Sequence, residues 1–219
     1  MEPHKRRNNP YTQIAALHNR GIDYVFRKLK DKHNYSEEIS FETILEIASE
    51  YIAKVQNEKS EEKKAISYSV IAEMFNMDRG RYIDSMLELK KVPKGVIRYL
   101  EEIRGLNEDF QSDELIRNIS NIEAQLLNSE YSNEDIKYVL LYIAIAKGSI
   151  KDWTQNYNLR FNVPEKQSGW PWKEDAESAL QGAFVESTIT GGVFSIVSVV
   201  GGSVVGSTWA AIKKKKNGQ

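Results

Sequence analysis

Hydrophobic residues recur three and four positions apart through most of this chain, which is the spacing of one face of an α-helix. The pattern holds over residues 14–29, 44–55 and 115–127, with polar residues between the apolar ones. Residues 138–146 are apolar throughout but too few to span a bilayer, so we expect them to form the central core helix. The pattern therefore predicts an all-α fold, with a multi-helix globular domain over residues 10–157.

Composition marks the ends of this domain. Residues 1–9 form a basic N-terminal tail, and Asn9-Pro10 is a typical helix start, because proline at the first helical position loses no hydrogen bond. Ser40 is a second predicted helix cap. Residues 158–173 contain prolines and a glycine and are predicted to be a linker. Residues 174–219 are predicted to hold an acidic helix, an apolar segment and a lysine tail.

The apolar segment, residues 187–212, contains no charged residue. At about 1.5 Å per residue, a helix of this length would extend about 39 Å, which exceeds the roughly 30 Å thickness of a hydrocarbon core. The segment is therefore a candidate transmembrane or membrane-interacting helix.

Small residues recur in this segment at a spacing of four, with one step of three. In a helix they lie on one side, where another backbone can approach closely, as in glycine-zipper association within lipid. The spacing predicts self-association of the chain through this small-residue stripe. Its residues are Ser187, Gly191, Ser195, Ser198, Gly202, Gly206 and Ala210.

Aromatic and basic residues border the segment, as expected where a helix leaves a bilayer. Lysines there would also be attracted to anionic lipid. The predicted membrane-interface anchors are Trp170, Trp172, Trp209, Lys213, Lys214, Lys215 and Lys216.

A different structure is also compatible with this segment. Valine, isoleucine and threonine are abundant in it, and Gly-Gly pairs separate its apolar runs, as in a buried β-hairpin. Its glycines also weaken a helix in water.

Composition restricts the chemistry. The 30 Lys and Arg residues nearly balance the 31 Asp and Glu residues, and we expect no nucleic-acid partner. The absence of cysteine excludes disulfides, thiolate metal sites and cysteine nucleophiles. His18 borders an apolar helical face and is expected to pack or cap, so with only His4 and His33 besides it we expect no metal site.

The sequence has no phosphate loop, zinc motif or nucleophile elbow. We therefore expect no catalytic residues and no cofactor. An enzyme whose site is assembled from scattered residues is a lesser alternative.

The N-terminus carries no secretory signal, so we expect the helical domain to be cytoplasmic, with the tail at the bacterial inner membrane. The lysines after the apolar segment favour a cytoplasmic C-terminus, which conflicts with this arrangement. A tail that is carried across, lies in the interface or inserts into another membrane would remove the conflict.

The run NPYTQIAALHNRGIDYVF, residues 9–26, resembles the opening of uncharacterised bacterial helical proteins with an Asn-Pro-Tyr turn, a His-Asn helix and a glycine-rich apolar tail. The tail is similar to the glycine-zipper segments of class II bacteriocins. The resemblance implies a tail that acts on membranes.

Two functional hypotheses follow. In the first, the protein is a non-enzymatic, toxin-like or effector-like membrane protein whose tail anchors, oligomerises or permeabilises a membrane under control of the helical domain. Its partners would be membrane lipid, further copies of the chain and an unidentified protein. In the second, it is a soluble helical interaction protein whose apolar tail is a buried hairpin or a partner-binding segment.

Overall fold

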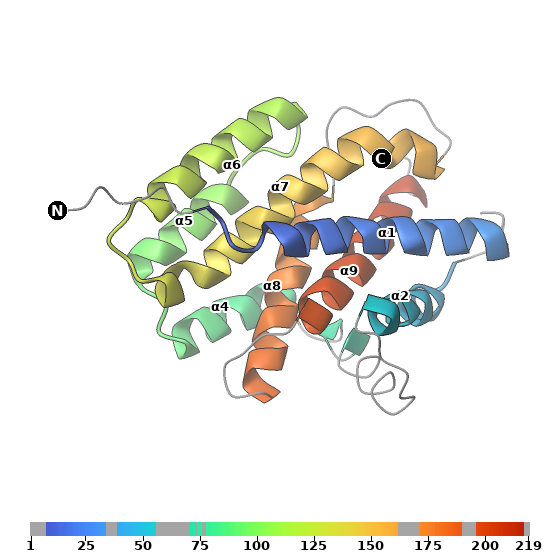
Figure 1. The fold of residues 1–219 in the computed structure, drawn as a ribbon, viewed down its shortest axis with the longest axis horizontal. Coiled ribbons are helices and arrows are strands. Elements are labelled where there is room, and N and C mark those ends of the chain that lie inside the picture. Colours follow the sequence, from blue (N-terminus) through green and yellow to red (C-terminus); the bar gives the residue numbers. More distant parts are fainter. Residues whose placement is uncertain are drawn as a thin grey trace.

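The computed structural model describes residues 8–33, 39–55, 71–72, 74–75, 78–161, 171–189 and 196–216 (Figure 1). Within these residues every regular element is a helix, which confirms the all-α prediction. In chain order the helices are α1 (Thr12–His33), α2 (Phe41–Val55), α4 (Arg79–Leu89), α5 (Lys94–Arg104), α6 (Ser112–Leu127), α7 (Asn133–Phe161), α8 (Trp172–Ile189) and α9 (Ile196–Lys216).

The first two helices begin at the predicted caps. Asn9 Oδ1 accepts a hydrogen bond from the N–H of Tyr11 at 3.0 Å, just before α1. Ser40 Oγ accepts one from the N–H of Thr43 at 3.2 Å, at the start of α2. These side chains satisfy N–H groups that have no partner within the helix, so local sequence determines where α1 and α2 begin.

Helix α7 is the helix against which α1, α5, α6 and α8 all pack (Figure 1). It begins with a reciprocal cap, in which Ser132 Oγ accepts from the N–H of Asp135 and Asp135 Oδ2 accepts from the N–H of Ser132. Residues 138–146 of α7 are all buried. The prediction that they form the central core helix is confirmed.

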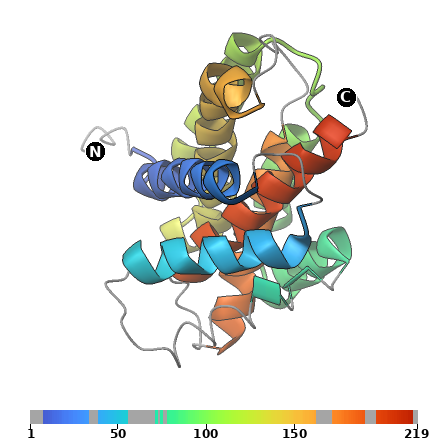
Figure 2. The same cartoon turned by 90° about the vertical axis from the view of Figure 1, so that its right-hand side faces the viewer.

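Helix α9 also lies inside the molecule, in contact with α8, α1 and α2 (Figures 1 and 2). The side chains of residues 198–208 are all buried. A helix without a polar face requires an apolar environment on all sides, which the surrounding helices provide here. The β-hairpin interpretation is wrong for residues 196–216, which are helical.

The structure places the predicted tail in the same hydrophobic core as the predicted domain. Buried residues of α8 and α9 join those of α1, α2 and α7 in one cluster. Helix α7 continues past residue 157 to Phe161, and α8 begins at Trp172, inside the predicted linker. The apolar faces of these helices cover one another, so one shared core removes more apolar surface from water than two separate units would.

The predicted apolar segment, residues 187–212, covers the end of α8 and most of α9. Residues 190–195 of that segment, residues 1–7 of the basic tail and residues 162–170 of the linker lie outside the described residues. Among the helices that the structure describes, none combines the length and the apolar character needed to cross a membrane.

Two glycines allow neighbouring helices to cross at short range. A Cβ on Gly182 of α8 would lie 2.7 Å from the carbonyl carbon of Ser198 and 3.2 Å from the Cα of Val199, both in α9. A Cβ on Gly148 of α7 would lie 2.8 Å from the Cβ of Ala15 in α1. Carbon atoms in ordinary contact are about 3.5–4.0 Å apart, so both crossings depend on the missing side chain.

Candidate functional site

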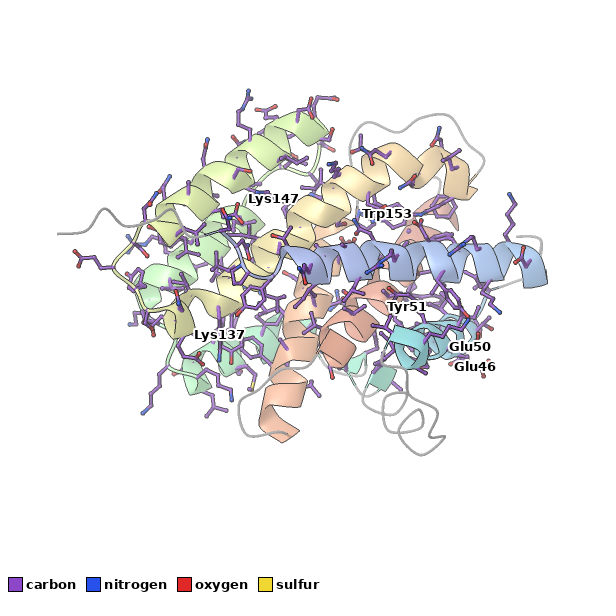
Figure 3. All side chains as sticks on the ribbon, viewed as in Figure 1. Glu46, Glu50, Tyr51, Lys137, Lys147 and Trp153 are labelled. Carbon is purple, nitrogen blue, oxygen red and sulfur yellow. The ribbon has the colours of Figure 1, made fainter. Side chains whose placement is uncertain are left out.

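Fully buried polar side chains gather where α1, α7, α8 and α9 meet. We call this group the Asp175 cluster and define it by His18 of α1, Ser149 and Trp153 of α7, Asp175 of α8 and Ser207 of α9. Each of these side chains has a relative exposure of 0%. Trp153 lies between α7 and α1 (Figure 3), with its ring centroid 5.9 Å from that of Phe26.

Asp175 accepts its hydrogen bonds at one oxygen. Ser149 Oγ and Trp153 Nε1, the latter at 3.0 Å, both donate to Oδ2. The buried Oδ1 has no hydrogen-bond partner among the described residues. Burial raises the pKa of Asp175 from 3.8 to about 7, although hydrogen bonds with Ser149, Ser207 and Trp153 lower it. Asp175 is therefore a carboxyl group that is readily protonated inside the core.

His18 makes two hydrogen bonds that determine its tautomer. Its Nδ1 lies 2.9 Å from Asn19 Oδ1, and its Nε2 lies 3.1 Å from Ser207 Oγ. Asn19 Nδ2 donates to the carbonyl of Gly148 at 3.1 Å, which turns Oδ1 of the same amide toward His18. The network thus assigns the proton of neutral His18 to Nδ1 and leaves Nε2 as an acceptor. Burial lowers the pKa of His18 from 6.5 to about 4, so the neutral form is favoured.

Ser207, His18 and Asn19 form the kind of hydrogen-bonded series that activates a nucleophilic serine. Two features oppose that chemistry in this conformation. Ser207 and His18 are completely buried, and Ser207 lies in the interior of α9, where helical hydrogen bonds engage the backbone N–H groups that an oxyanion would need. The arrangement can instead hold and exchange a proton and connect four helices.

The structure brings three residues of the predicted small-residue stripe into contact with the rest of the same chain. Ser198 lies at the close crossing with Gly182, and a Cβ on Gly202 would lie 2.5 Å from Met74 Cε and 3.1 Å from the carbonyl oxygen of Ser178. A Cβ on Gly206 would collide with Oγ of Ser178 and lie 2.9 Å from its Cβ. These positions are small because α8 and residues 74–75 pack against them.

Of the other four stripe residues, the structure describes Ala210 in full and only the backbone of Ser187. Ala210 is half-buried near the end of α9. Ser187 belongs to α8, but its side chain lies outside the described part of the chain, as do Gly191 and Ser195 altogether. Self-association through the stripe stays a prediction.

Two of the predicted membrane anchors are tryptophans that take part in the fold. Trp172 opens α8 and is completely buried. Trp209 is half-buried and meets the ring of Phe41 at 5.6 Å and 73°, an edge-on contact between α9 and α2. Trp170 lies outside the described residues.

The predicted lysine anchors also make contacts within the chain. Lys213 Nζ lies 4.8 Å from the centroid of the Trp209 ring, and Lys214 forms ion pairs with Glu108 at 3.7 Å and Glu174 at 3.6 Å. Lys215 and Lys216 end α9, with side chains outside the described part. Lys214 thus joins the C-terminal end of α9 to Glu108 and to α8, whereas the contact of Lys213 lies within α9 itself.

Elsewhere in the described structure, candidate sites are few. A small surface pocket lies beside the start of α7 and is lined by Lys90, Val92, Glu134, Asp135, Lys137 and Tyr138. Among the described residues, no group of three or more His, Asp and Glu side chains is arranged to hold a metal ion.

Sequence reasoning identified His18 as a packing residue but missed the rest of the Asp175 cluster. Asp175 has the sequence signature of an ordinary acidic residue in the first turn of a helix, which the helix dipole favours. Ser149 and Ser207 carry no local signal. Only the packing of four helices brings these residues together.

No family model matches this sequence, and no curated protein or solved structure matches it either.

Proposed function

We propose that this chain is a non-enzymatic helical interaction protein in which the glycine-rich α8–α9 hairpin forms the core. The observation that carries the proposal is that the small-residue face of α9 is occupied by α8 of the same chain. Glycines that would serve association in lipid thus have a role within the fold, as close-packing positions. The outer, charged faces of the surrounding helices are then the surfaces that partners meet.

The test is flotation with vesicles of mixed zwitterionic and anionic phospholipid in a density gradient without detergent. We expect the full chain to remain at the bottom of the gradient, with α9 enclosed. Lipid-dependent flotation of the folded, full-length protein would contradict the proposal. A version in which all four C-terminal lysines are replaced by Gln separates electrostatic adsorption from apolar insertion, because only adsorption depends on these charges.

A membrane-acting function is a second candidate, favoured by the lack of any charged residue in α9 between Ile196 and Ile212. In this proposal the bundle stores α9, and a signal or partner releases it so that its stripe contacts lipid or another copy. Two sequence features support it, the bacteriocin-like tail and the basic end of the helix. Its location would be the bacterial inner membrane.

A reversible disulfide between α8 and α9 tests this candidate, because the chain has no cysteine of its own. An ideal Cβ on Gly206 lies 2.9 Å from that of Ser178, and a disulfide needs about 3.5–4.5 Å, so a small helix shift admits the bond. For Ser178→Cys with Gly206→Cys, we expect dye release from vesicles only after reduction. Each single variant is the control. Equal release in the oxidised and reduced forms, or none in the original protein, would contradict storage and release of α9.

A further inference from the structure

The Ser207 hydroxyl lies between two groups of the Asp175 cluster that both require a proton. It is 3.1 Å from His18 Nε2, an acceptor in neutral histidine, and its interaction with Asp175 lowers the pKa of that carboxyl group. His18 Nε2 and Asp175 Oδ2 are 3.9 Å apart, too far for a direct hydrogen bond. The single O–H of Ser207 can donate to the neutral imidazole or to the carboxylate, but not to both. If both of these forms are present, one of the two acceptors therefore has no donor from Ser207.

We propose that His18 and Asp175 share one proton through Ser207, so that the junction of α1, α7, α8 and α9 carries no net charge. With the proton on Asp175, its carboxyl O–H donates to Ser207, Ser207 donates to His18 Nε2, and His18 Nδ1–H donates to Asn19. With the proton on His18 Nε2, that nitrogen donates to Ser207, and Ser207 donates to the carboxylate. In both directions each hydrogen bond of the series joins one donor to one acceptor, and each direction contains the same number of protons.

Burial explains why the shared proton is retained. His18 and Asp175 are both fully buried, and a net charge at either place would be expensive to desolvate. The charged groups that act on the pair are Arg160 of α7, which disfavours protonated His18, and Glu174 of α8, which disfavours ionised Asp175. Helix α9 contributes the neutral hydroxyl of Ser207 to the series and a backbone hydrogen bond at Ser203, which raises the pKa of His18. The surroundings thus favour the form with neutral partners.

The two pKa shifts agree with this inference and have opposite effects on stability. The pKa of Asp175 is raised from 3.8 to about 7 in the folded chain. Taken alone, the contribution of Asp175 to the stability of the folded chain is therefore greatest in acid and is lost as the pH rises toward 7. The pKa of His18 is lowered from 6.5 to about 4, so taken alone its effect is lost as the pH falls from 6.5 to 4.

Between these limits the two effects cancel. From about pH 4 to 6.5 the folded pair holds one proton, shared inside the core, and the unfolded chain also holds one, on the histidine. Folding therefore moves a proton but neither takes one up nor releases one at this site. The packing of α9 at Ser207 is then insensitive to pH over this range, a property that goes beyond the proposed function and does not depend on it.

Replacing either His18 or Asp175 alone should remove the cancellation and make the stability of the chain depend on pH. The measured quantity is the unfolding equilibrium constant from urea titrations of the full chain at pH 4.5, 5.5 and 6.5. The double variant His18→Gln with Asp175→Asn is the reference, because it contains neither titrating group and retains every other one. Relative to this double variant, we expect the unfolding equilibrium constant of the original protein to show no additional pH dependence.

For Asp175→Asn alone, we expect unfolding to become up to about tenfold more favourable for each unit by which the pH falls. For His18→Gln alone, we expect unfolding to become up to about tenfold less favourable for each unit by which the pH falls. Single variants whose pH dependence equals that of the double variant would overturn the proposal.

A spectroscopic measurement on the unsubstituted protein keeps the proposal testable if a variant fails to fold. At pH 6, NMR of the histidine ring reports the protonation of His18, and infrared difference spectroscopy reports a protonated carboxyl group. The proposal expects either neutral His18 with a protonated carboxyl band or protonated His18 without one. Neutral His18 together with no such band would overturn it.

Discussion

The close crossing of α8 and α9 at Gly182 leads to a sharp prediction for Gly182→Ala. In a helix interior, alanine is more favourable than glycine by roughly 1 kcal/mol, so the local effect of the substitution is stabilising. The added Cβ, however, would meet the carbonyl oxygen of Ser198, lie 2.7 Å from its carbonyl carbon and lie 3.2 Å from the Cα of Val199. These are backbone atoms of a buried helix, which cannot rotate away as a side chain can.

The expected magnitude follows from these two opposing effects. Relieving the collision requires α8 and α9 to separate locally by several tenths of an ångström or more, and overpacking of this kind costs about 1–3 kcal/mol. At the upper end of that range the collision costs about 3 kcal/mol, and the higher helix propensity of alanine offsets about 1 kcal/mol of it. We therefore expect Gly182→Ala to lower the free energy of unfolding by about 2 kcal/mol. For a chain of this size the melting temperature should fall by roughly 4–8 °C.

Gly80→Ala is the matched control. Gly80 is exposed in α4, and the nearest atom that its Cβ would meet is Asp78 Oδ1 at 3.8 Å, an ordinary contact. We expect this variant to be as stable as the original or more stable by up to about 1 kcal/mol. Urea denaturation followed by circular dichroism measures both variants, and unchanged m-values would show that the midpoints report stability. If Gly182→Ala matched Gly80→Ala, the helices would not cross as closely as described.

Three further substitutions test other parts of the fold. Lys91 has a φ of 55° in a turn after α4 that backbone hydrogen bonds close, a conformation that glycine adopts more easily. Lys91→Gly should therefore raise the free energy of unfolding, measured by urea titration, by about 1 kcal/mol. No increase would argue against that backbone conformation. Arg160 pairs with the buried Asp152 at 2.6 Å, so Arg160→Met should lower stability by about 3 kcal/mol at pH 8. The loss should be smaller at pH 4, because burial raises the pKa of Asp152 and so favours its neutral form in acid; equal losses at both pH values would contradict the reasoning. Gly206→Ala should destabilise less than Gly182→Ala, because a rotatable hydroxyl on Ser178 is the first obstacle, and Ser178→Ala should recover part of the loss in a double-mutant cycle.

The helical character of the chain and several of its boundaries could be predicted from sequence because they depend on neighbouring residues. Apolar spacing along one face identified the helices, and the side chains of Asn9 and Ser40 cap helices at the predicted places. The core position of residues 138–146 followed from an apolar run too short for a membrane. Each of these properties is decided within a few residues of the chain.

The environment of α9 was decided by the tertiary structure. An uncharged helix lined with small residues has the same sequence signature whether lipid or other helices surround it, because both environments are apolar. The spacing of Gly202 and Gly206 indicates close approach of another segment, whose backbone lies near Gly202 and whose side chains lie near Gly206, but it does not say which segment. In the structure it is α8 of the same chain, held by contacts that sequence spacing cannot encode.

The Asp175 cluster shows the same division between local and tertiary information. By itself the sequence determined a histidine beside an apolar face and an acidic residue in a first helical turn, and both types are common in structural helices. Their meeting with Ser207 requires α1, α8 and α9 to pack together, and that packing excludes the water that would otherwise set their protonation. The sequence thus determined that most of the chain is helical, and only the tertiary structure decided which polar groups share a buried environment, because burial is a property of the assembled core.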